Sequence, residues 1–175
     1  TLGNTDQMDH YRYFSCSDKH SNEAYFFPKR RDEESFGKDE VLKILGRIEN
    51  PDQAEIRFAH GKWDDNREEL TEALEQLQEQ GAHVQVVTNA DLDKDIRKEL
   101  NQLHQGIFYL EEDINMHTKF FLIEQGDKRE VWTGSHNLTK RSLRENFEVL
   151  LKVNDPIIYQ QYKEYFDRIK TISAP

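Results

Sequence analysis

The sequence predicts an α/β fold in which a mixed β-sheet is sandwiched between helices. Two observations predict this class. Patterns typical of strands alternate along the chain with amphipathic patterns typical of helices, and clusters of Val, Ile, Leu and Phe supply a core although 33% of the residues are charged. A chain of 175 residues is long enough for one well-buried domain and too short for two typical ones. We therefore expect one folding unit over residues 39–175, preceded by an arm or linker over residues 1–38.

The predicted elements follow one another in a regular order after the arm. The arm shows no sustained periodicity, although residues 25–28 form a short extended pattern that ends at a proline. Helices are predicted, from apolar residues at helical spacing, over residues 41–48, 66–80, 96–103 and 156–169. Strands are predicted over residues 55–59, 84–87, 107–110, 117–124, 130–135 and 147–153.

Local signals mark several ends of these elements. Pro51 stops the first helix, Gly81 closes the second, and Pro156 opens the last. Residues 125–128, between two predicted strands, contain turn chemistry that suits a hairpin. The inner side of the last helix is expected to consist of Ile158, Tyr162, Tyr165, Phe166 and Ile169.

Composition narrows the class of protein. The chain has no apolar run of about 18 residues and no signal core at its start, so we expect no membrane-spanning segment. Cys16 is the lone cysteine, which excludes an intramolecular disulfide and a multi-cysteine metal site. The net charge of −10 disfavours a large non-specific nucleic-acid surface, because such surfaces need Lys and Arg. Since the chain starts at Thr1 and not at Met, we expect a processed form or a piece of a longer protein.

One group of residues in the second half of the chain suits a phosphate. Side chains of a strand alternate between its faces, so His117 and Lys119 are expected to share a face. Ser135 and Asn137 share a face of the strand after the predicted hairpin, and they can converge on His117 if the two strands pair. Lysine neutralises phosphate, Ser and Asn donate hydrogen bonds to it, and a neutral imidazole can attack phosphorus. Glu148 could hold the ring of His117 in one tautomer and stabilise its positive form.

These residues resemble the signature of the phospholipase D superfamily, which is H-x-K, four residues, an acidic residue, and then G-S-x-N. The chain has His117-Thr118-Lys119, four further residues, Glu124, and then Gly134-Ser135-His136-Asn137. The resemblance extends to Glu148, where the family places an acidic partner for the histidine. It implies a two-step reaction through a covalent phosphohistidine on His117, which water or an alcohol then releases. It also implies that no metal or other cofactor is needed.

The match to this signature has two departures. Glu124 stands where the family usually has Asp, and nine residues separate it from Gly134 where the family commonly has six. Asp127 keeps the six-residue spacing but falls in the predicted turn, so Glu124 is the preferred match. A hairpin turn longer by three residues explains the spacing and leaves the catalytic faces intact.

Two further histidines lie in related patterns. His60-Gly61-Lys62 is a second H-x-K, but no strand with G-S-x-N follows it. We therefore expect His60 to be a decoy or part of the pocket rim. His136 lies inside the motif and is expected to line the substrate pocket without performing chemistry.

The resemblance implies that half of the active site is missing, because the family builds a complete site from two H-x-K halves. One histidine attacks phosphorus and the other protonates the leaving group. The chain is then either the C-terminal half of a tandem enzyme or one copy of a dimer. We favour the tandem origin, because residues 25–28 resemble the corresponding region of secreted bacterial tandem members. A secreted, extracellular protein is therefore expected, with the cytoplasm as the alternative.

The expected substrate is a phospholipid, which is hydrolysed or whose phosphatidyl group is transferred. The secreted tandem members act mainly on lipids, and the net charge of −10 disfavours long nucleic acids. Two alternatives remain open. One is a homodimeric nuclease of the same superfamily, and the other is a non-catalytic half that binds a partner subunit.

Overall fold

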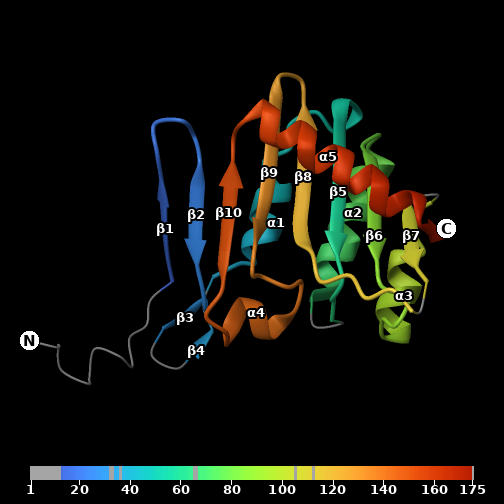
Figure 1. Ribbon diagram of the computed structural model, residues 1–175. Coiled ribbons are helices and arrows are strands. Elements are labelled where there is room, and N and C mark those ends of the chain that lie inside the picture. Colours follow the sequence, from blue (N-terminus) through green and yellow to red (C-terminus); the bar gives the residue numbers. More distant parts are fainter. Residues whose placement is uncertain are drawn as a thin grey trace, which may run out of the picture.

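The computed structural model describes residues 13–31, 34–35, 37–64, 67–104, 106–111 and 113–174 of the chain. Its centre is a nine-stranded sheet with the order β1-β2-β10-β9-β8-β5-β6-β7-β11 (Figure 1). These strands are β1 (Phe14–Ser17), β2 (Glu23–Phe26), β5 (Ala54–His60), β6 (His83–Thr88), β7 (Ile107–Leu110), β8 (Lys119–Gln125), β9 (Lys128–Gly134), β10 (Val149–Val153) and β11 (Ser173–Ala174). A separate ribbon consists of β3 (Arg30–Arg31) and β4 (Glu34–Ser35).

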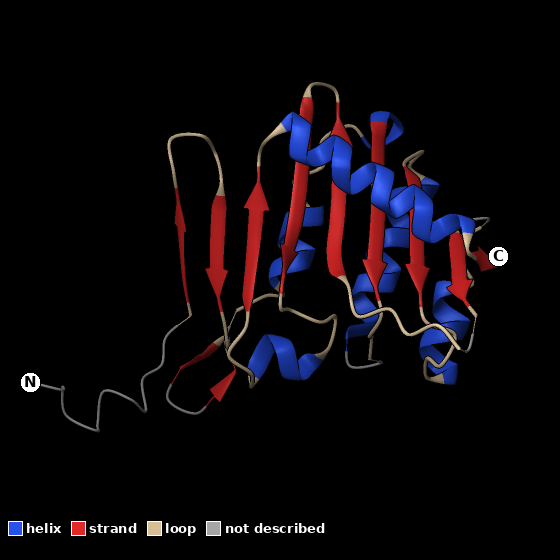
Figure 2. Cartoon of the chain, in the orientation of Figure 1, coloured by secondary structure: helices blue, strands red, loops and turns tan. Residues whose placement is uncertain are grey.

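Helices cover both faces of the sheet (Figure 2). They are α1 (Glu40–Leu45), α2 (Glu68–Glu79), α3 (Lys94–Leu100), α4 (Lys140–Arg144) and α5 (Pro156–Thr171), with a 3-10 turn at Pro51–Gln53. In Figure 1, α5 crosses one face from β9 towards β11, and α1, α2 and α3 lie on the other. This arrangement confirms the predicted α/β class with a mixed sheet between helices. Sequence patterns did not predict α4, which has only five residues.

The strand directions bring two distant segments together at one end of the sheet. β5, β6 and β7 run parallel and are joined through α2 and α3, as crossover connections require. β8 runs antiparallel to β5, so the last residue of β5, His60, pairs with the first residue of β8, Lys119. The loops after β5 and β6 therefore meet the loop before β8.

Each face of the sheet carries its own apolar core. The cluster beneath α1, α2 and α3 includes Ile56, Phe58, Val84, Phe121 and Trp132. The cluster beneath α5 includes Phe120, Leu122, Tyr159, Phe166 and Ile169. The predicted inner side of α5 is therefore wrong in part: Tyr159 is buried, whereas Ile158 and Tyr165 are exposed. Their positions depend on the angle at which the helix crosses the sheet, which periodicity alone does not specify.

The segment expected to be an arm supplies two strands to the sheet. β2 pairs antiparallel with β10, and β1 pairs antiparallel with β2. Tyr25 and Phe27 are buried in the core on the α1 side. The extended pattern at residues 25–28 was the visible signal, but strands of four residues are too short to show clear alternation. The division of the chain at residue 38 stays a prediction.

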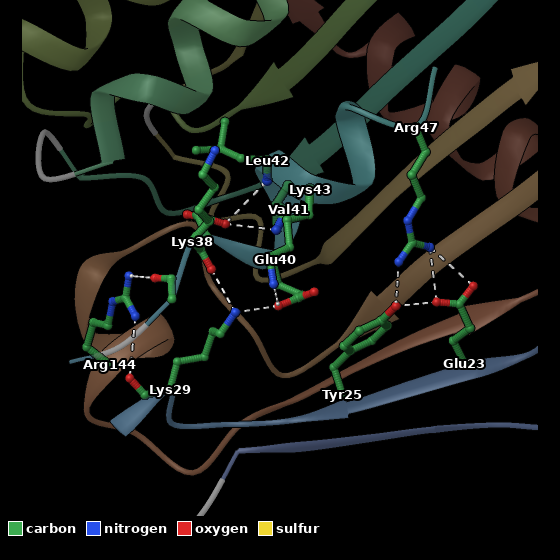
Figure 3. Close-up of polar contacts among 12 residues, drawn as sticks. Glu23, Tyr25, Lys29, Lys38, Glu40, Val41, Leu42, Lys43, Arg47 and Arg144 are labelled. Carbon is green, nitrogen blue, oxygen red and sulfur yellow. Dashed lines mark hydrogen bonds and ion pairs between the residues drawn. The ribbon is translucent and has the colours of Figure 1, made fainter. Parts of the chain in front are cut away.

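Polar contacts fasten this N-terminal segment to α1 and the turn after it (Figure 3). The buried ammonium of Lys29 donates to the Glu40 carboxylate at 2.6 Å. Arg47 donates to the Tyr25 hydroxyl at 2.8 Å and pairs with Glu23 at 3.1 Å. Burial lowers the pKa of Lys29, and the adjacent Glu40 carboxylate opposes that shift. The segment thus packs as part of the sheet and its cover.

The predicted hairpin joins β8 and β9. Gln125 pairs with Lys128, so Gly126 and Asp127 form a two-residue turn. Gly126 has a φ of 57°, the left-handed conformation that such turns require. The turn is therefore short, and the long spacing between Glu124 and the G-S-x-N motif reflects strand residues on both sides of it.

Candidate active site

His117 and Lys119 meet at the end of the sheet where β8 begins. Lys119 is the first residue of β8, and His117 lies in the preceding loop with an exposed side chain. The Lys119 ammonium lies 3.3 Å from His117 Nε2 and donates to the His117 carbonyl oxygen at 2.9 Å. Because an ammonium can only donate, the imidazole nitrogen would be the acceptor in a hydrogen bond between them. The predicted proximity of the two side chains is present, although His117 lies outside the strand.

A cavity of 380 Å³ at this end of the sheet is lined by His117, Lys119 and Asn137 together. Lys62, from the loop after β5, and Asn89, from the end of β6, also line it. Its size falls within the range of small-molecule sites. A second cavity, of 430 Å³, lies on the α5 side of His117 and Lys119.

The G-S-x-N motif lies at this end of the sheet, but Ser135 and Asn137 follow β9 and do not belong to the strand as predicted. β9 ends at Gly134, and Thr133 pairs with Phe120 and therefore lies on the α5 face of the sheet. Ser135 donates from its backbone N to the Val149 carbonyl at 3.0 Å, and its hydroxyl accepts from Val149 N at 3.1 Å. Asn137 reaches the cavity because the chain has left the strand and no longer alternates between faces.

Gly134 is a point at which the backbone of β9 lies close to the chain at the start of β10. Its φ is 154°, and a Cβ at this position would overlap the carbonyl oxygen of Val149. Glycine is therefore required here for backbone reasons, before any role in chemistry.

The position of Glu148 differs from the predicted one. Its Oε1 accepts from the Ser142 hydroxyl at 3.3 Å and from Asn146 Nδ2 at 3.2 Å. In the described part of the chain, no hydrogen bond joins Glu148 to His117. Burial lowers the pKa of Lys119, and the nearby charge of Glu148 opposes this shift. The electrostatic effect of Glu148 within this site is therefore on the lysine.

Glu124 lies far from the cavity. It pairs with Arg129 at 3.0 Å and accepts from the Tyr159 hydroxyl at 3.0 Å. It follows Lys119 by five residues along β8, which corresponds to about 16 Å in an extended strand. The acidic position of the signature is therefore a structural link between β8, β9 and α5 in this chain.

Neither His60, expected to be a decoy or part of the pocket rim, nor His136, expected to line the substrate pocket, lines the 380 Å³ cavity. Their exposed fractions are 1% and 2%, and of the second H-x-K only Gly61 and Lys62 line the cavity. Burial, together with the nearby charges of Arg67 and Lys119, lowers the pKa of His60 to about 3. Burial also lowers the pKa of His136, again with help from Arg67. Both imidazoles lie beneath the site as neutral groups.

Asn89 is a site residue that sequence reasoning missed. Its Oδ1 accepts from Met116 N at 2.8 Å, and its Nδ2 donates to the carbonyls of Gly61 at 3.0 Å and Met116 at 3.1 Å. It thus ties the loop before His117 to the loop after β5. The available signal was its place directly after a buried parallel strand, where ligand sites of α/β proteins occur. Arg67, which lies beneath the motif, offered no comparable signal.

The sheet between two layers of helices, with H-x-K and G-S-x-N meeting at one end, defines a phospholipase D-like protein. The chain belongs to the family described as "Cardiolipin synthase, PLD-like domain", whose model matches residues 44–170. No curated protein matches the sequence.

Solved structures show the same fold. The phospholipase D family member Nuc from Salmonella typhimurium has a TM-score of 0.64 at 18% identity, over 87% of this chain and 95% of that one. NucT from Helicobacter pylori has a TM-score of 0.64 at 19% identity, over 88% and 98% of the two chains. Phosphatidylserine synthase from Haemophilus influenzae Rd KW20 has a TM-score of 0.54 at 13% identity, over 85% of this chain and 38% of that one.

Two features of the described residues concern membranes and metals. None of the helices there combines the length and the apolar character that a membrane crossing requires. Within the same residues, no three His, Cys, Asp or Glu side chains are grouped so that they could hold a metal ion.

Proposed function

We propose that the chain is one half of a phospholipase D-type phosphodiesterase in which His117 is the nucleophile. Lys119 and Asn137 bind the substrate phosphate, with Ser135 as a further donor. The observation that carries this proposal is the common cavity of 380 Å³ that His117, Lys119 and Asn137 line. An exposed neutral imidazole beside a lysine and an amide supplies a nucleophile and two phosphate donors in one place.

The proposed reaction has two steps and uses no metal or other cofactor. In the first step, His117 Nε2 attacks phosphorus and the bond from phosphorus to the leaving oxygen breaks. The histidine of a second half-site gives that oxygen a proton. In the second step, water or an alcohol attacks the phosphohistidine, gives its proton to the second histidine, and releases neutral His117. The Lys119 ammonium, now 3.3 Å from His117 Nε2, moves to the phosphate oxygens when substrate enters.

Glu148 supports this chemistry by opposing the loss of charge on Lys119, whose pKa burial lowers. A charged lysine neutralises the phosphate, whereas a neutral one does not. The role assigned from the sequence, in which Glu148 orients the ring of His117, stays a prediction. The hydrogen bonds of Glu148 to Ser142 and Asn146 both use Oε1.

The second half-site is proposed to bind the sheet face that α5 leaves uncovered. In Figure 1, α5 does not extend over β10, β2 and β1. On this face, which we call the docking face, lie Phe14, Ala24, Phe26, Val149 and Leu151. Phe14 is 51% exposed and Leu151 is 37% exposed, and Leu151 pairs with Thr133 at the edge of the 430 Å³ cavity. The face is apolar and continuous with the site, as the contact of a second half requires. This second half-site is either a missing N-terminal half or a second copy of the chain.

The proposed substrate is a phospholipid. The family description names cardiolipin synthase, and a phosphatidylserine synthase shares the fold. The net charge of −10 supports the same choice, because it opposes binding of a long polyanion. Secretion of the protein stays a prediction.

A nuclease is the second candidate, and one observation favours it. A cavity of 1310 Å³ beside α4 is lined by cationic side chains from Lys38, Lys43, Lys140 and Arg144. This local basic surface could bind a phosphate backbone despite the acidic balance of the chain. Glu69 and Glu72 line the same cavity and reduce its positive potential, which leaves the phospholipid as the first choice.

The proposal is tested by trapping the covalent intermediate. The chain, alone and with a candidate second half, is incubated with phosphatidylcholine vesicles or with single-stranded DNA and quenched in alkali, because phosphohistidine is acid-labile. We expect a phosphohistidine at residue 117, and His117→Ala should lower turnover by about three orders of magnitude or more. The exposed-histidine control His104→Ala should retain activity.

The same assays test the substrate, the absence of a metal requirement and the identity of the nucleophile. Turnover of vesicles supports the phospholipid, whereas turnover of DNA that falls steeply with salt supports the nuclease. A chelator should leave the rate unchanged. Loss of activity that zinc or magnesium restores would overturn the metal-free mechanism, and wild-type activity of His117→Ala would overturn the proposed nucleophile.

A further inference from the structure

We propose that Arg67 is a positioning residue: held by Asp39, its guanidinium fixes the loop of residues 134–137 so that the Asn137 amide faces the substrate phosphate. This inference rests on the proposed function of the same site. It concerns a residue that does not line the 380 Å³ cavity and does not touch the reacting atoms.

Asp39 holds one side of the guanidinium. Arg67 Nε donates to Asp39 Oδ2 at 2.6 Å, and Nη2 donates to Asp39 Oδ1 at 2.7 Å. The two side chains are only 3% and 8% exposed. Asp39 also accepts from Val41 N at 2.8 Å as the cap of α1, and Arg67 stands directly before α2. The planar fork is therefore anchored to the first turns of two helices.

The other side of the guanidinium holds the motif loop. Arg67 Nη1 donates to the carbonyl oxygen of Asn137 at 3.1 Å and to His136 Nε2 at 3.0 Å. Because a guanidinium only donates, His136 must be neutral with Nε2 as the acceptor. The ring of His136 also packs on that of Phe27, with 4.3 Å between ring centroids. Both the backbone of Asn137 and the side chain before it are thus fixed.

The loop needs such support because the strand ladder ends within it, where Ser135 N makes the last bond to β10. β9 stops at Gly134. Beyond that point, Leu138 N donates to the Lys62 carbonyl at 3.2 Å, and Asp64 N donates to the Leu138 carbonyl at 3.2 Å. These bonds hold the far end of the loop. Arg67 acts at Asn137 itself, and its contacts determine how the amide is presented to the cavity.

Energetics favour a positional role over a stabilising one. Burying two charges costs desolvation that their attraction only partly offsets, so a buried ion pair contributes little net stability compared with apolar residues. The Asp39 and Arg67 pair nevertheless lies next to the motif, where a displacement of about 1 Å can reduce catalysis strongly.

Arg67→Lys tests the inference, because it keeps a positive charge beside Asp39 but removes the planar guanidinium and its several N–H donors. We expect kcat/KM to fall about 10- to 100-fold, the range that one hydrogen bond to a charged group provides. The fall should be mainly in kcat, with the folded fraction unchanged by circular dichroism. In an Asn137→Ala background, Arg67→Lys should cause no further loss, because the residue through which it acts is gone. Arg129→Lys, at the half-exposed pair with Glu124, is the matched control and should retain full activity.

A second readout does not depend on turnover. Inorganic phosphate is titrated into the chain while the Asn137 side-chain amide is followed by NMR. The amide signal should shift in the wild type and should be broadened and unresponsive in Arg67→Lys. If the wild type turns over no phosphodiester even with its second half-site supplied, but shows this difference, the positioning role holds and the proposed function fails.

The inference is overturned by either of two results. One is wild-type kcat/KM and a wild-type phosphate response in Arg67→Lys, and the other is a full additional loss in the Asn137→Ala background. If Arg67→Lys does not fold, His136→Leu and His136→Gln replace it, because both keep side-chain volume and only Gln keeps an acceptor. Loss of the phosphate response in Leu but not in Gln supports the inference, and an equal response in both refutes it.

Discussion

At the residue scale, two histidines in the same H-x-K pattern have opposite environments. His117 is exposed beside the cavity, and Lys119 contacts its Nε2. His60 is 1% exposed, lies 5.8 Å from the Phe58 ring between centroids, and has an Nδ1 without a partner among the described residues. A nucleophile must reach its substrate, so burial excludes His60 from this role and leaves His117. The H-x-K pattern alone does not distinguish the two histidines.

The buried histidines predict how stability depends on pH. Burial lowers the pKa of His60 to about 3, whereas the unfolded chain protonates it near its ordinary value of about 6.5. The unfolded state therefore binds more protons below pH 6.5, and the free energy of unfolding falls as the pH is lowered from there towards 3. His60 should account for about 2 kcal/mol of that fall between pH 7.5 and pH 5.

Urea unfolding of the wild type and of His60→Gln at the two pH values measures this contribution. The fall should be smaller by about 2 kcal/mol in the variant, because Gln does not titrate. His104→Gln, which changes an exposed histidine, should leave the fall unchanged. An identical pH dependence in all three proteins would mean that His60 is protonated in the folded chain.

At the element scale, α5 connects the stability of the fold with the site. It covers the core on one face of the sheet, and its Tyr162 and Tyr165 line the 430 Å³ cavity beside His117. Its N-terminus is capped by Asp155, whose Oδ1 accepts from Ile157 N at 2.8 Å and from Ile158 N at 2.9 Å. Loss of this cap should loosen the first turn of the helix.

Asp155→Ala should lower the free energy of unfolding by about 1 kcal/mol, the usual contribution of a side-chain cap. Asp155→Asn should lower it much less, because an amide oxygen can still accept from the helix N–H groups. Chemical denaturation measures both. Equal losses in the two variants would show that the charge of Asp155, and not its capping bonds, stabilises α5.

At the scale of the whole molecule, one apolar surface remains to be covered. The docking face lies on the same side of the sheet as α5 and adjoins the active-site end through Leu151 and Thr133. Among the described residues, His117 is the one histidine that lines the 380 Å³ cavity, whereas the proposed reaction uses two. The proposed second half-site would supply the second histidine and cover this face.

Leu151→Glu should abolish association with the second half-site, because it places a charge within the apolar docking face. Solution mass and activity are measured over a dilution series, with and without a separately supplied N-terminal half. A dimeric enzyme should lose specific activity on dilution, whereas a tandem half should be silent until its missing half is added. Ile172→Glu, at a 52% exposed position after α5, should behave as wild type. Full turnover by a proven monomer would contradict both versions.

The sequence by itself determined the features that depend on neighbours along the chain. Alternating patterns predicted the order of helices and strands, Gly126 predicted the hairpin, and the two short motifs identified His117, Lys119 and Asn137, which the structure brings to one cavity. These signals are local, because helix and strand periods are set by backbone geometry within a few residues.

Tertiary structure alone decided the features that depend on which segments pair. The register of β5 with β8 places His60 next to Lys119 and inside the core, although its pattern matches that of the exposed His117. Pairing with β10 turns the expected arm into part of the sheet. Arg67 and Asn137, 70 residues apart, meet only because α2 begins beside the motif loop. Burial and long-range hydrogen bonds depend on contacts between distant residues, and the period of a local pattern carries no information about them.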